Sequence, residues 1–290
     1  MFTKILLTLL ISNFSIAGNE AAVYGVRHFE TSGLTKTNHF AIEPIINSPS
    51  AVVLDKETGR VLFNKNGNEQ RQIASITKLI TSYLYLKKTN EDLSQEMTMK
   101  KNDARNGGQS HVYAGERGTA RDFLHLTLVS SDNSAAITLA REGGFLDSFS
   151  EETEKMAKQL SLKDTFLVEP SGLDSRNVST ALEIALFARE IFKNDTLKTI
   201  TTKKTYSFSP INALLAQRRI TTTNDLLTTD LFTIAAGKTG HTSAAGFCLV
   251  FQARSSDGRE IIIALLGADT SETRFQDAKI LGSWIFENFR

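Results

Sequence analysis

Apolar positions along the chain follow two different periods, and their order predicts the fold class. Residues 51–55 and 60–63 are apolar-rich runs separated by Lys56-Glu57-Thr58-Gly59, a pattern typical of a β-hairpin. From Ser75 to about Lys88 the apolar side chains recur at helical spacing instead, at Ile76, Leu79, Ile80, Tyr83 and Leu84. The folded part of the chain is therefore expected to begin with strands and to continue with a helix.

The middle of the chain is predicted to be helical and its end to return to strands. Thr119 with Asp122 forms an approximate capping box ahead of an apolar helix. Further helices are predicted over residues 134–141, before the glycine pair 143–144, and over 182–192. Apolar runs then predict strands at 246–253 and 260–267, with a turn at 255–258 and a closing helix over 271–288. Strands at both ends with helices inserted between them predict an α+β fold, one antiparallel sheet plus a helical lobe.

The N-terminus has the pattern of a cleavable secretory signal. Lys4 precedes an uncharged, mostly apolar stretch over residues 5–17, and Ser15 and Ala17 are small residues just before a cut ahead of Gly18. The alternative is an apolar strand that stays in the fold. We assign residues 1–17 to a signal peptide, 18–49 to a leader or linker without a sustained period, and 50–290 to one folded domain.

Composition narrows the function classes. The 290 residues are 41% apolar, and 33 basic residues balance 32 acidic ones, so no basic surface predicts nucleic-acid binding. A single cysteine, Cys248, excludes an intramolecular disulfide, and its apolar neighbours predict a buried structural thiol. The histidines lack metal-ligand spacing, and no phosphate-binding loop or Gly-x-Ser-x-Gly elbow is present. We therefore predict no metal and no cofactor.

Candidate chemistry lies in three short strings, the first of which is Ser75-Ile76-Thr77-Lys78. Ser75 opens the predicted helix, and Lys78 follows about one turn later on the same side. Burial and the positive end of the helix favour a neutral lysine amine, which can take the proton of the serine. The Ser75 N–H precedes the helical hydrogen bonds and can stabilise an oxyanion. The alternative is a serine N-cap with a solvated lysine.

The second and third strings add groups that an acyl-transfer site needs. Ser131 and Asn133 lie in a break between helices, where they can relay a proton and orient Lys78 and a substrate carbonyl, or simply cap a helix. The third string is a strand with small residues that a ligand can approach, or a plain turn. In this string, Lys238 supplies a cation, and Thr239 and Thr242 supply hydroxyls that can bind a carboxylate. Gly240 is one of the small residues, and His241 offers a second backbone N–H for an oxyanion.

Together the strings resemble those of penicillin-binding proteins and serine β-lactamases. Residues 73–81, 168–173 and 177–181 are similar to the low-molecular-mass D-alanyl-D-alanine peptidases, and residues 244–250 to their endopeptidase branch. The resemblance covers about residues 50–290. It implies a β-lactamase/transpeptidase-like fold, with a five-stranded antiparallel sheet flanked by helices and an inserted all-helical lobe.

The resemblance also implies an activity, the hydrolysis of peptidoglycan stem peptides through a serine acyl-enzyme in the periplasm of a Gram-negative cell. Ser75 would be the nucleophile, Lys78 its base, and Ser131 with Asn133 the relay and positioning pair. Lys238, Thr239 and Thr242 would hold the substrate carboxylate. β-Lactam antibiotics would acylate Ser75 and leave slowly.

Three alternatives remain at this point. A class A β-lactamase would need an asparagine four residues after Glu169, where Leu173 stands. A penicillin-binding sensor would keep the fold and lose turnover. Between carboxypeptidase and endopeptidase, residues 244–250 and an end directly after the closing helix favour endopeptidase. The apolar face of that helix is expected to pack on the sheet, without a permanent membrane anchor. Arg274 is the nearest candidate for an additional carboxylate-binding arginine and is not included in the predicted site.

Overall fold

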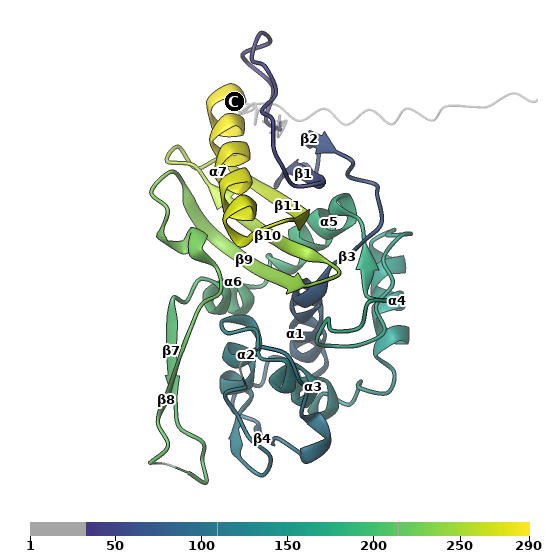
Figure 1. Cartoon of the computed structure of the whole chain (residues 1–290), viewed down its shortest axis with the longest axis vertical. Helices are drawn as coiled ribbons and strands as arrows, with labels where there is room; N and C mark the ends of the chain where they lie inside the picture. The colour runs from purple at the N-terminus through teal and green to yellow at the C-terminus, as the bar shows by residue number, and fades with distance from the viewer. Residues whose placement is uncertain (1–32, 109, 214) are drawn as a thin grey trace, which may run out of the picture. The chain divides into compact units, whose positions relative to one another are not determined.

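A five-stranded antiparallel sheet is the centre of the structure, a computed structural model in which residues 33–108, 110–213 and 215–290 are described. The strands follow the order β2-β1-β11-β10-β9 (Figure 1). The predicted signal peptide and residues 18–32 of the predicted leader lie outside the described residues. The strand bounds are β1 Ser50–Asp55, β2 Val61–Lys65, β9 Thr233–Thr242, β10 Gly246–Arg254 and β11 Glu260–Ala268.

Both faces of the sheet are covered, because successive side chains of a strand point to opposite faces and every residue of β1 is buried. On one face, Val53 and Ile263 pack in the apolar cluster that contains Leu281 of helix α7, Ser271–Asn288. On the other face, Val52 and Ile262 join the larger cluster formed with the helices of the lobe. The α+β prediction, with an antiparallel sheet and helices inserted between its first and last strands, is confirmed.

The predicted helices are confirmed with small shifts at their ends. The helix expected from Ser75 is a 3-10 turn, Ala74–Ile76, followed by α1. Thr119 caps α2 through a complete capping box with Asp122, and α3 ends at Gly143. The bounds are α1 Thr77–Lys88, α2 Ala120–Leu128, α3 Asn133–Glu142, α4 Phe149–Gln159, α5 Ala181–Ile191 and α6 Asp195–Thr201.

Several elements were not predicted from the pattern. Helix α4 buries only Phe149, Thr153, Met156 and Ala157 among charged residues, so its apolar stripe is short. The hairpin of β7, Thr205–Phe208, and β8, Arg218–Thr221, extends beside the helical lobe (Figure 1). Each strand is only four residues long, too short to show a clear period in the sequence, although Tyr206, Phe208 and Ile220 pack on the larger apolar cluster. Two-stranded ribbons also pair β3, Arg71–Gln72, with β6, Val178–Ser179, and β4, Glu96–Thr98, with β5, Arg117–Thr119.

The part of the predicted leader that is described, residues 33–49, runs beside the C-terminal end of the chain (Figure 1). Thr35 and Arg290 exchange two backbone hydrogen bonds, of 2.7 and 2.9 Å. The fully buried carboxylate of Asp277 in α7 accepts hydrogen bonds from the N–H groups of Asn47 and Ser48 and from the Ser48 hydroxyl. This segment is therefore bonded at one end to α7 and at the other to the residue pair that follows this helix.

Two further expectations concern burial. Cys248 is a buried free thiol, as predicted, and burial raises its pKa to about 11. Phe275, Ala278, Leu281 and Ile285 of α7 are buried against the sheet, so the packing interpretation of the closing helix is confirmed. Within the described ranges, no helix combines the length and the apolar character that a membrane crossing requires.

Asp277→Ala tests how the N-terminal segment is held. Removing the carboxylate leaves buried N–H groups without partners, so we expect the free energy of unfolding to fall by about 3 kcal/mol. Urea denaturation measures this loss, with Lys279→Ala as the matched control, because Lys279 is exposed on the same helix. The control is expected to change the free energy by less than about 0.5 kcal/mol. Equal effects of the two substitutions would contradict the anchoring role of Asp277.

Candidate active site

Ser75 lies in the 3-10 turn that leads into α1, and its position leaves its backbone N–H available. The first hydrogen bond of the turn runs from the Ile76 N–H to the Ile73 oxygen, at 3.1 Å, so the Ser75 N–H precedes the helical pairing. Neither the turn nor α1 has a side-chain cap, which means that Ser75 does not act as an N-cap. Ala74 has a φ of +46°, a strained value for a residue with a side chain.

Two glycines allow other segments to approach this turn closely. Gly172 has a φ of +81°, and a Cβ at this position would lie 2.0 Å from the Ala74 oxygen. A Cβ at Gly240 of β9 would lie 2.8 Å from the Ile73 oxygen and 3.2 Å from the Ser75 nitrogen. Side chains at either position would push the serine turn away from its neighbours.

Lys78 is fully buried, and its amine lies beside the Ser75 hydroxyl. The Nζ atom is 2.8 Å from Ser75 Oγ, 2.7 Å from Asn133 Oδ1 and 2.6 Å from the Ser171 carbonyl oxygen. Burial lowers the pKa of Lys78 to about 7, against the opposing charges of Glu169 and Asp132. A neutral amine has two N–H donors, which the Asn133 and Ser171 oxygens occupy. Its lone pair is then left to accept the Ser75 proton.

Ser131 is held in the left-handed region, with a φ of +62°, between α2 and α3. Its hydroxyl accepts a hydrogen bond of 2.9 Å from Lys238, which also donates to the Thr239 carbonyl oxygen. Burial, followed by the nearby charges of Lys78 and Arg274, lowers the pKa of Lys238 well below its ordinary value. Ser131 and Lys238 therefore form a second hydroxyl–amine pair, and this lysine is buried behind the site.

Asp132, between the two predicted residues, takes the structural role of the second string. Its carboxylate caps α3 by accepting from the Ala135 N–H and also accepts from the His111 N–H. Asn133, in contrast, points its amide at Lys78 and donates to the Gly107 oxygen at 2.6 Å. Capping thus falls to the middle residue, and the outer two are free to face the site.

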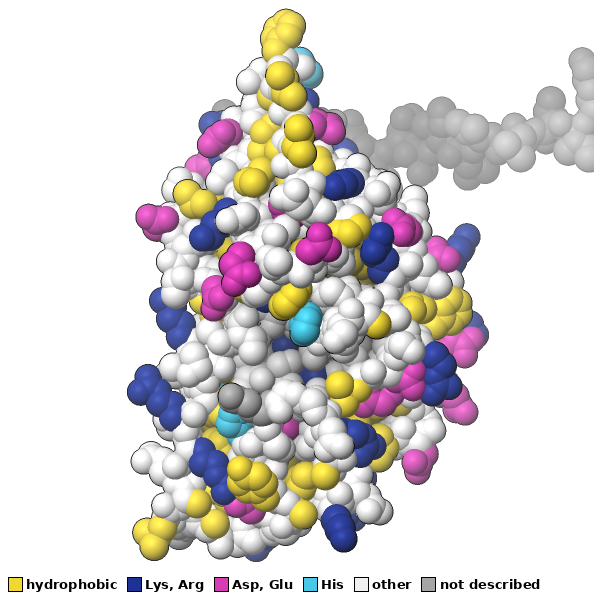
Figure 2. Space-filling view, in the orientation of Figure 1, with side chains coloured by type: hydrophobic (Ala, Val, Ile, Leu, Met, Phe, Trp, Pro, Cys, Tyr) yellow, Lys and Arg dark blue, Asp and Glu magenta, His cyan; other side chains and the backbone are white. Residues whose placement is uncertain are grey.

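The groups border one cleft of about 780 Å³ between β9 and the helical lobe. Figure 2 shows this face, on which uncharged atoms surround a hollow between sheet and lobe. Predicted residues on its wall are Ser75, Ser131, Asn133, Thr239, Gly240, His241 and Thr242; Lys78 and Lys238 contact two of these hydroxyls from behind. Strings far apart in the sequence are therefore brought together, whereas another Ser-x-Asn string of the chain, Ser175-Arg176-Asn177, does not border the cleft. There, Asn177 accepts hydrogen bonds from the Val168 and Glu169 N–H groups.

Comparisons with known proteins place this site in a family. The D-alanyl-D-alanine carboxypeptidase model, peptidase S11, matches residues 37–270. The chain belongs to the peptidase S11 family. It is 35% identical over 243 residues to the D-alanyl-D-alanine endopeptidase of Pseudomonas aeruginosa, covering 82% of this chain and 77% of that protein. An Escherichia coli protein of the same description is 33% identical, with 84% and 79% covered. The solved Streptomyces K15 DD-transpeptidase aligns with a TM-score of 0.79 at 25% identity, over 85% of this chain and all of that one.

Arg274 of this S11 peptidase is a cleft residue that the sequence prediction omitted. Its guanidinium donates to the carbonyl oxygens of Cys248 and Gly240, at 3.2 and 3.3 Å, and stacks near the rings of Phe247 and Phe275. Burial lowers its pKa to about 10. The residue lies within a helix, with no neighbouring motif to mark it. It reaches the cleft because it lies on the face of α7 that packs against the sheet.

Glu169, the residue that invites comparison with class A β-lactamases, has a structural role here. Its carboxylate accepts hydrogen bonds from the N–H groups of Ser171, Gly172 and Leu173, at 2.9, 2.8 and 3.1 Å. It does not border the cleft. These bonds fix the turn that carries Gly172 and the Ser171 carbonyl oxygen against Ala74 and Lys78.

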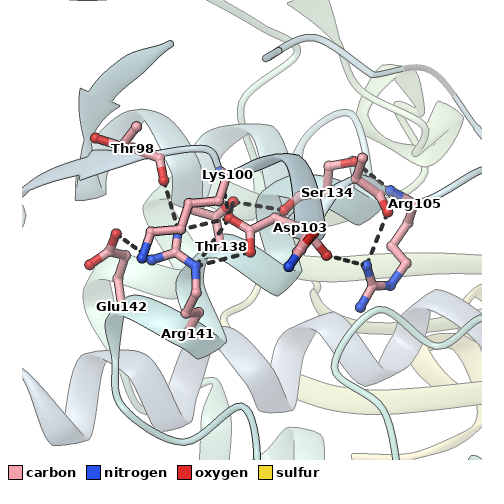
Figure 3. A network of polar contacts seen from close by, with 10 residues as sticks. Thr98, Lys100, Asp103, Arg105, Ser134, Thr138, Arg141 and Glu142 are labelled. Atoms are coloured by element: carbon pink, nitrogen blue, oxygen red, sulfur yellow. Dashed lines mark hydrogen bonds and ion pairs between the residues drawn. The ribbon is translucent and has the colours of Figure 1, made fainter. Parts of the chain in front are cut away.

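An ion pair between half-buried Arg141 and the buried Asp103 carboxylate lies in the helical lobe (Figure 3). Arg141 of α3 binds the Asp103 carboxylate at 2.7 Å and the Thr98 oxygen, and Thr138 also donates to Asp103. Burial by itself raises the pKa of Asp103, but the hydrogen bonds from Arg141, the Lys100 N–H and Thr138 outweigh it and hold the pKa below its ordinary value. Residues 104–108, which provide the Gly107 oxygen that binds Asn133, therefore follow directly after a residue that is bonded to α3.

Gly172→Ala tests the close approach at the serine turn. A methyl group would meet the Ala74 oxygen at a φ that disfavours side chains, so we expect a loss of about 3 kcal/mol or more in unfolding free energy. Gly144→Ala is the matched control, because Gly144 has a φ of +70° but no atom within 4 Å of its Cβ position. We expect the control to cost about 1 kcal/mol. Similar losses in urea denaturation would show that the contact with Ala74 is unimportant.

Proposed function

We propose that this S11 family member is a periplasmic serine DD-peptidase that hydrolyses D-alanyl bonds of peptidoglycan peptides. One observation carries the proposal: a buried lysine amine with a pKa of about 7 lies 2.8 Å from a serine hydroxyl at the floor of a cleft. That pair can make an alkoxide-like nucleophile at neutral pH without histidine or metal. Among the described residues, no group of three or more His, Cys, Asp or Glu is arranged to hold a metal ion.

The reaction follows from the two hydroxyl–amine pairs. Lys78 takes the Ser75 proton as Oγ attacks the substrate carbonyl, and the N–H groups of Ser75 and His241 stabilise the oxyanion. The C–N bond then breaks, and the Ser131 hydroxyl passes the proton that Lys78 took up to the departing amine. Lys238 donates a hydrogen bond to this hydroxyl. A water molecule attacks the resulting ester, so that the acid is released and Ser75 regains its proton.

Substrate binding uses the edge of the sheet. Strand β9 is the last strand in the order, so one of its edges can pair with an extended peptide. Thr239 and Thr242 offer hydroxyls for the carboxylate of the leaving residue, with Arg274 as the nearby cation. Because Lys238 is buried with a lowered pKa, we assign the attraction for this carboxylate to Arg274 rather than to Lys238.

Within this class, we favour cross-link endopeptidase activity over carboxypeptidase activity. The two relatives at 35% and 33% identity are both described as endopeptidases. The β-lactamase alternative loses support because Glu169 is bonded to three backbone N–H groups away from the cleft. Acylation by penicillin at Ser75 and export through residues 1–17 belong to the same proposal.

Digestion of purified sacculi tests the activity directly. We expect the enzyme to convert cross-linked muropeptide dimers to monomers, identified by mass, and Ser75→Ala to lose this activity by at least about a thousandfold. Release of single D-alanine residues instead would favour carboxypeptidase. Labelling by penicillin without any turnover of sacculi would favour a binding sensor, and steady turnover of penicillin faster than that of muropeptides a β-lactamase.

The pH dependence of acylation tests the role of Lys78. Because its pKa is lowered, the neutral base is gained as pH rises, and acylation by labelled penicillin should increase between pH 6 and 8. With a pKa of about 7, the rate at pH 6 is expected to be about tenfold below the plateau. Lys78→Arg should lose acylation, because arginine does not deprotonate in proteins. A flat profile, or full labelling of a folded Lys78→Arg variant, would contradict a neutral lysine base.

A further inference from the structure

The cleft has an uneven charge distribution. No Asp or Glu borders it among the described residues, and its two permanently charged side chains are Arg274 and Arg219. Arg274 is bonded to carbonyl oxygens of the sheet next to Gly240. Arg219 comes from a different element, strand β8 of the hairpin that extends beside the helical lobe. The cleft therefore carries a second positive charge, on a different element from Ser75 and from Arg274.

Arg219 differs from its neighbour in how it is bound. Arg218 forms an ion pair with Glu116 at 2.5 Å, and its guanidinium lies 4.9 Å from the centre of the Tyr113 ring. Alternation along the strand turns the next side chain the other way. Arg219 is exposed, and its one side-chain hydrogen bond is a long contact of 3.4 Å to Thr205. Within the described ranges, no carboxylate forms an ion pair with it.

The strand that carries Arg219 flanks the side from which the leaving group departs. The Thr223 N–H donates to the Val129 oxygen, and its hydroxyl contacts the Thr239 hydroxyl at 2.5 Å. Residues 219–223 therefore line the cleft beside Ser131, the hydroxyl assigned to protonating the departing amine. The amine that leaves when the acyl-enzyme forms departs next to Ser131 and therefore close to this wall.

We propose that Arg219 binds a carboxylate of the leaving peptide, beyond the residue whose own carboxylate lies at Thr239 and Thr242. The inference rests on the proposed function and deepens it. A leaving D-alanine ends at its single carboxylate, whereas a leaving cross-linked stem peptide continues and carries further carboxylates. Arg219 is thus a specificity-determining residue that favours cross-linked substrates over monomeric pentapeptides.

Arg219→Gln provides the test, with kcat/KM measured on a purified cross-linked muropeptide dimer and on a monomeric pentapeptide. An exposed charge pair has a modest effect, so we expect a loss of about three- to fivefold on the dimer. Activity on the pentapeptide and the rate of labelling by penicillin should stay within about twofold of wild type. Raising the salt concentration to about 0.5 M should shrink the loss, because mobile ions screen exposed charges.

Two further variants test whether the effect depends on a positive charge at position 219 or on the loss of any positive charge nearby. Arg219→Lys should retain most of the activity on the dimer. Lys204→Gln is the matched control, since Lys204 is exposed on the same hairpin and does not border the cleft. It should leave both substrates unaffected. An equal loss from Lys204→Gln and Arg219→Gln would overturn the inference, and so would equal effects of Arg219→Gln on both substrates or no effect at all.

Amidation of the substrate identifies the group that Arg219 recognises. In the test dimer, carboxamides replace the carboxylates of the leaving peptide beyond the one assigned to Thr239 and Thr242. The wild type should cleave this dimer as slowly as Arg219→Gln cleaves the free acid. The variant itself should not distinguish the two dimers. If amidation slows both enzymes equally, the carboxylate is bound elsewhere and the inference fails. A wild-type enzyme inactive on both dimer and pentapeptide would refute the proposed function itself, which is a distinguishable result.

Discussion

The site depends on removing one amine from water. Lys78 is fully buried, and its burial lowers its pKa enough for a neutral form to exist near pH 7. Two oxygens, from Asn133 and from the Ser171 main chain, fix the direction of the amine and leave its lone pair for Ser75. Each of those oxygens comes from a different segment. The lysine can therefore be buried and oriented only when the sheet, the lobe and the 170–173 turn have assembled around it.

Close approach of backbones makes that assembly possible. Gly172 and Gly240 bring two segments against the serine turn at distances that no side chain allows. Ala74 and Ser131 adopt left-handed backbone conformations beside them, each costing on the order of 1–3 kcal/mol. The two apolar clusters on either side of the sheet offset this strain. The strained backbone at the site thus depends on the stability that the two apolar clusters contribute.

Burial also makes the basic residues of the site differ in their roles. Burial lowers the pKa values of both Lys78 and Lys238, and the nearby charge of Lys78 lowers that of Lys238 further. These two lysines suit proton transfer better than attraction of an anion. The arginines at the cleft wall remain charged at neutral pH and suit carboxylate binding. Proton chemistry and substrate recognition are accordingly assigned to different types of side chain.

Features that depend on residues close together in the chain could be predicted from the sequence. Helical spacing places Ser75 and Lys78 one turn apart, the Thr119–Asp122 capping box sets the start of α2, and apolar runs define β10 and β11. The resemblance of three strings to a known family added the five-stranded sheet and the convergence of the strings. Elements with weak apolar patterns, such as α4 and the β7–β8 hairpin, were missed, since their contacts with the lobe stabilise them more than their local periodicity does.

Which polar residues face the cleft could be learned only from the folded chain. It distinguished Asn133 from Asn177, which stand in similar Ser-x-Asn strings. The Asn133 amide oxygen accepts a hydrogen bond from Lys78, whereas that of Asn177 accepts from the backbone of a turn. It also gave Glu169 a structural role and brought Arg274 and Arg219 to the cleft wall. The physical reason is that desolvation and hydrogen bonding depend on segments distant in sequence. A one-dimensional pattern contains the groups but not the neighbours that set their charge and direction.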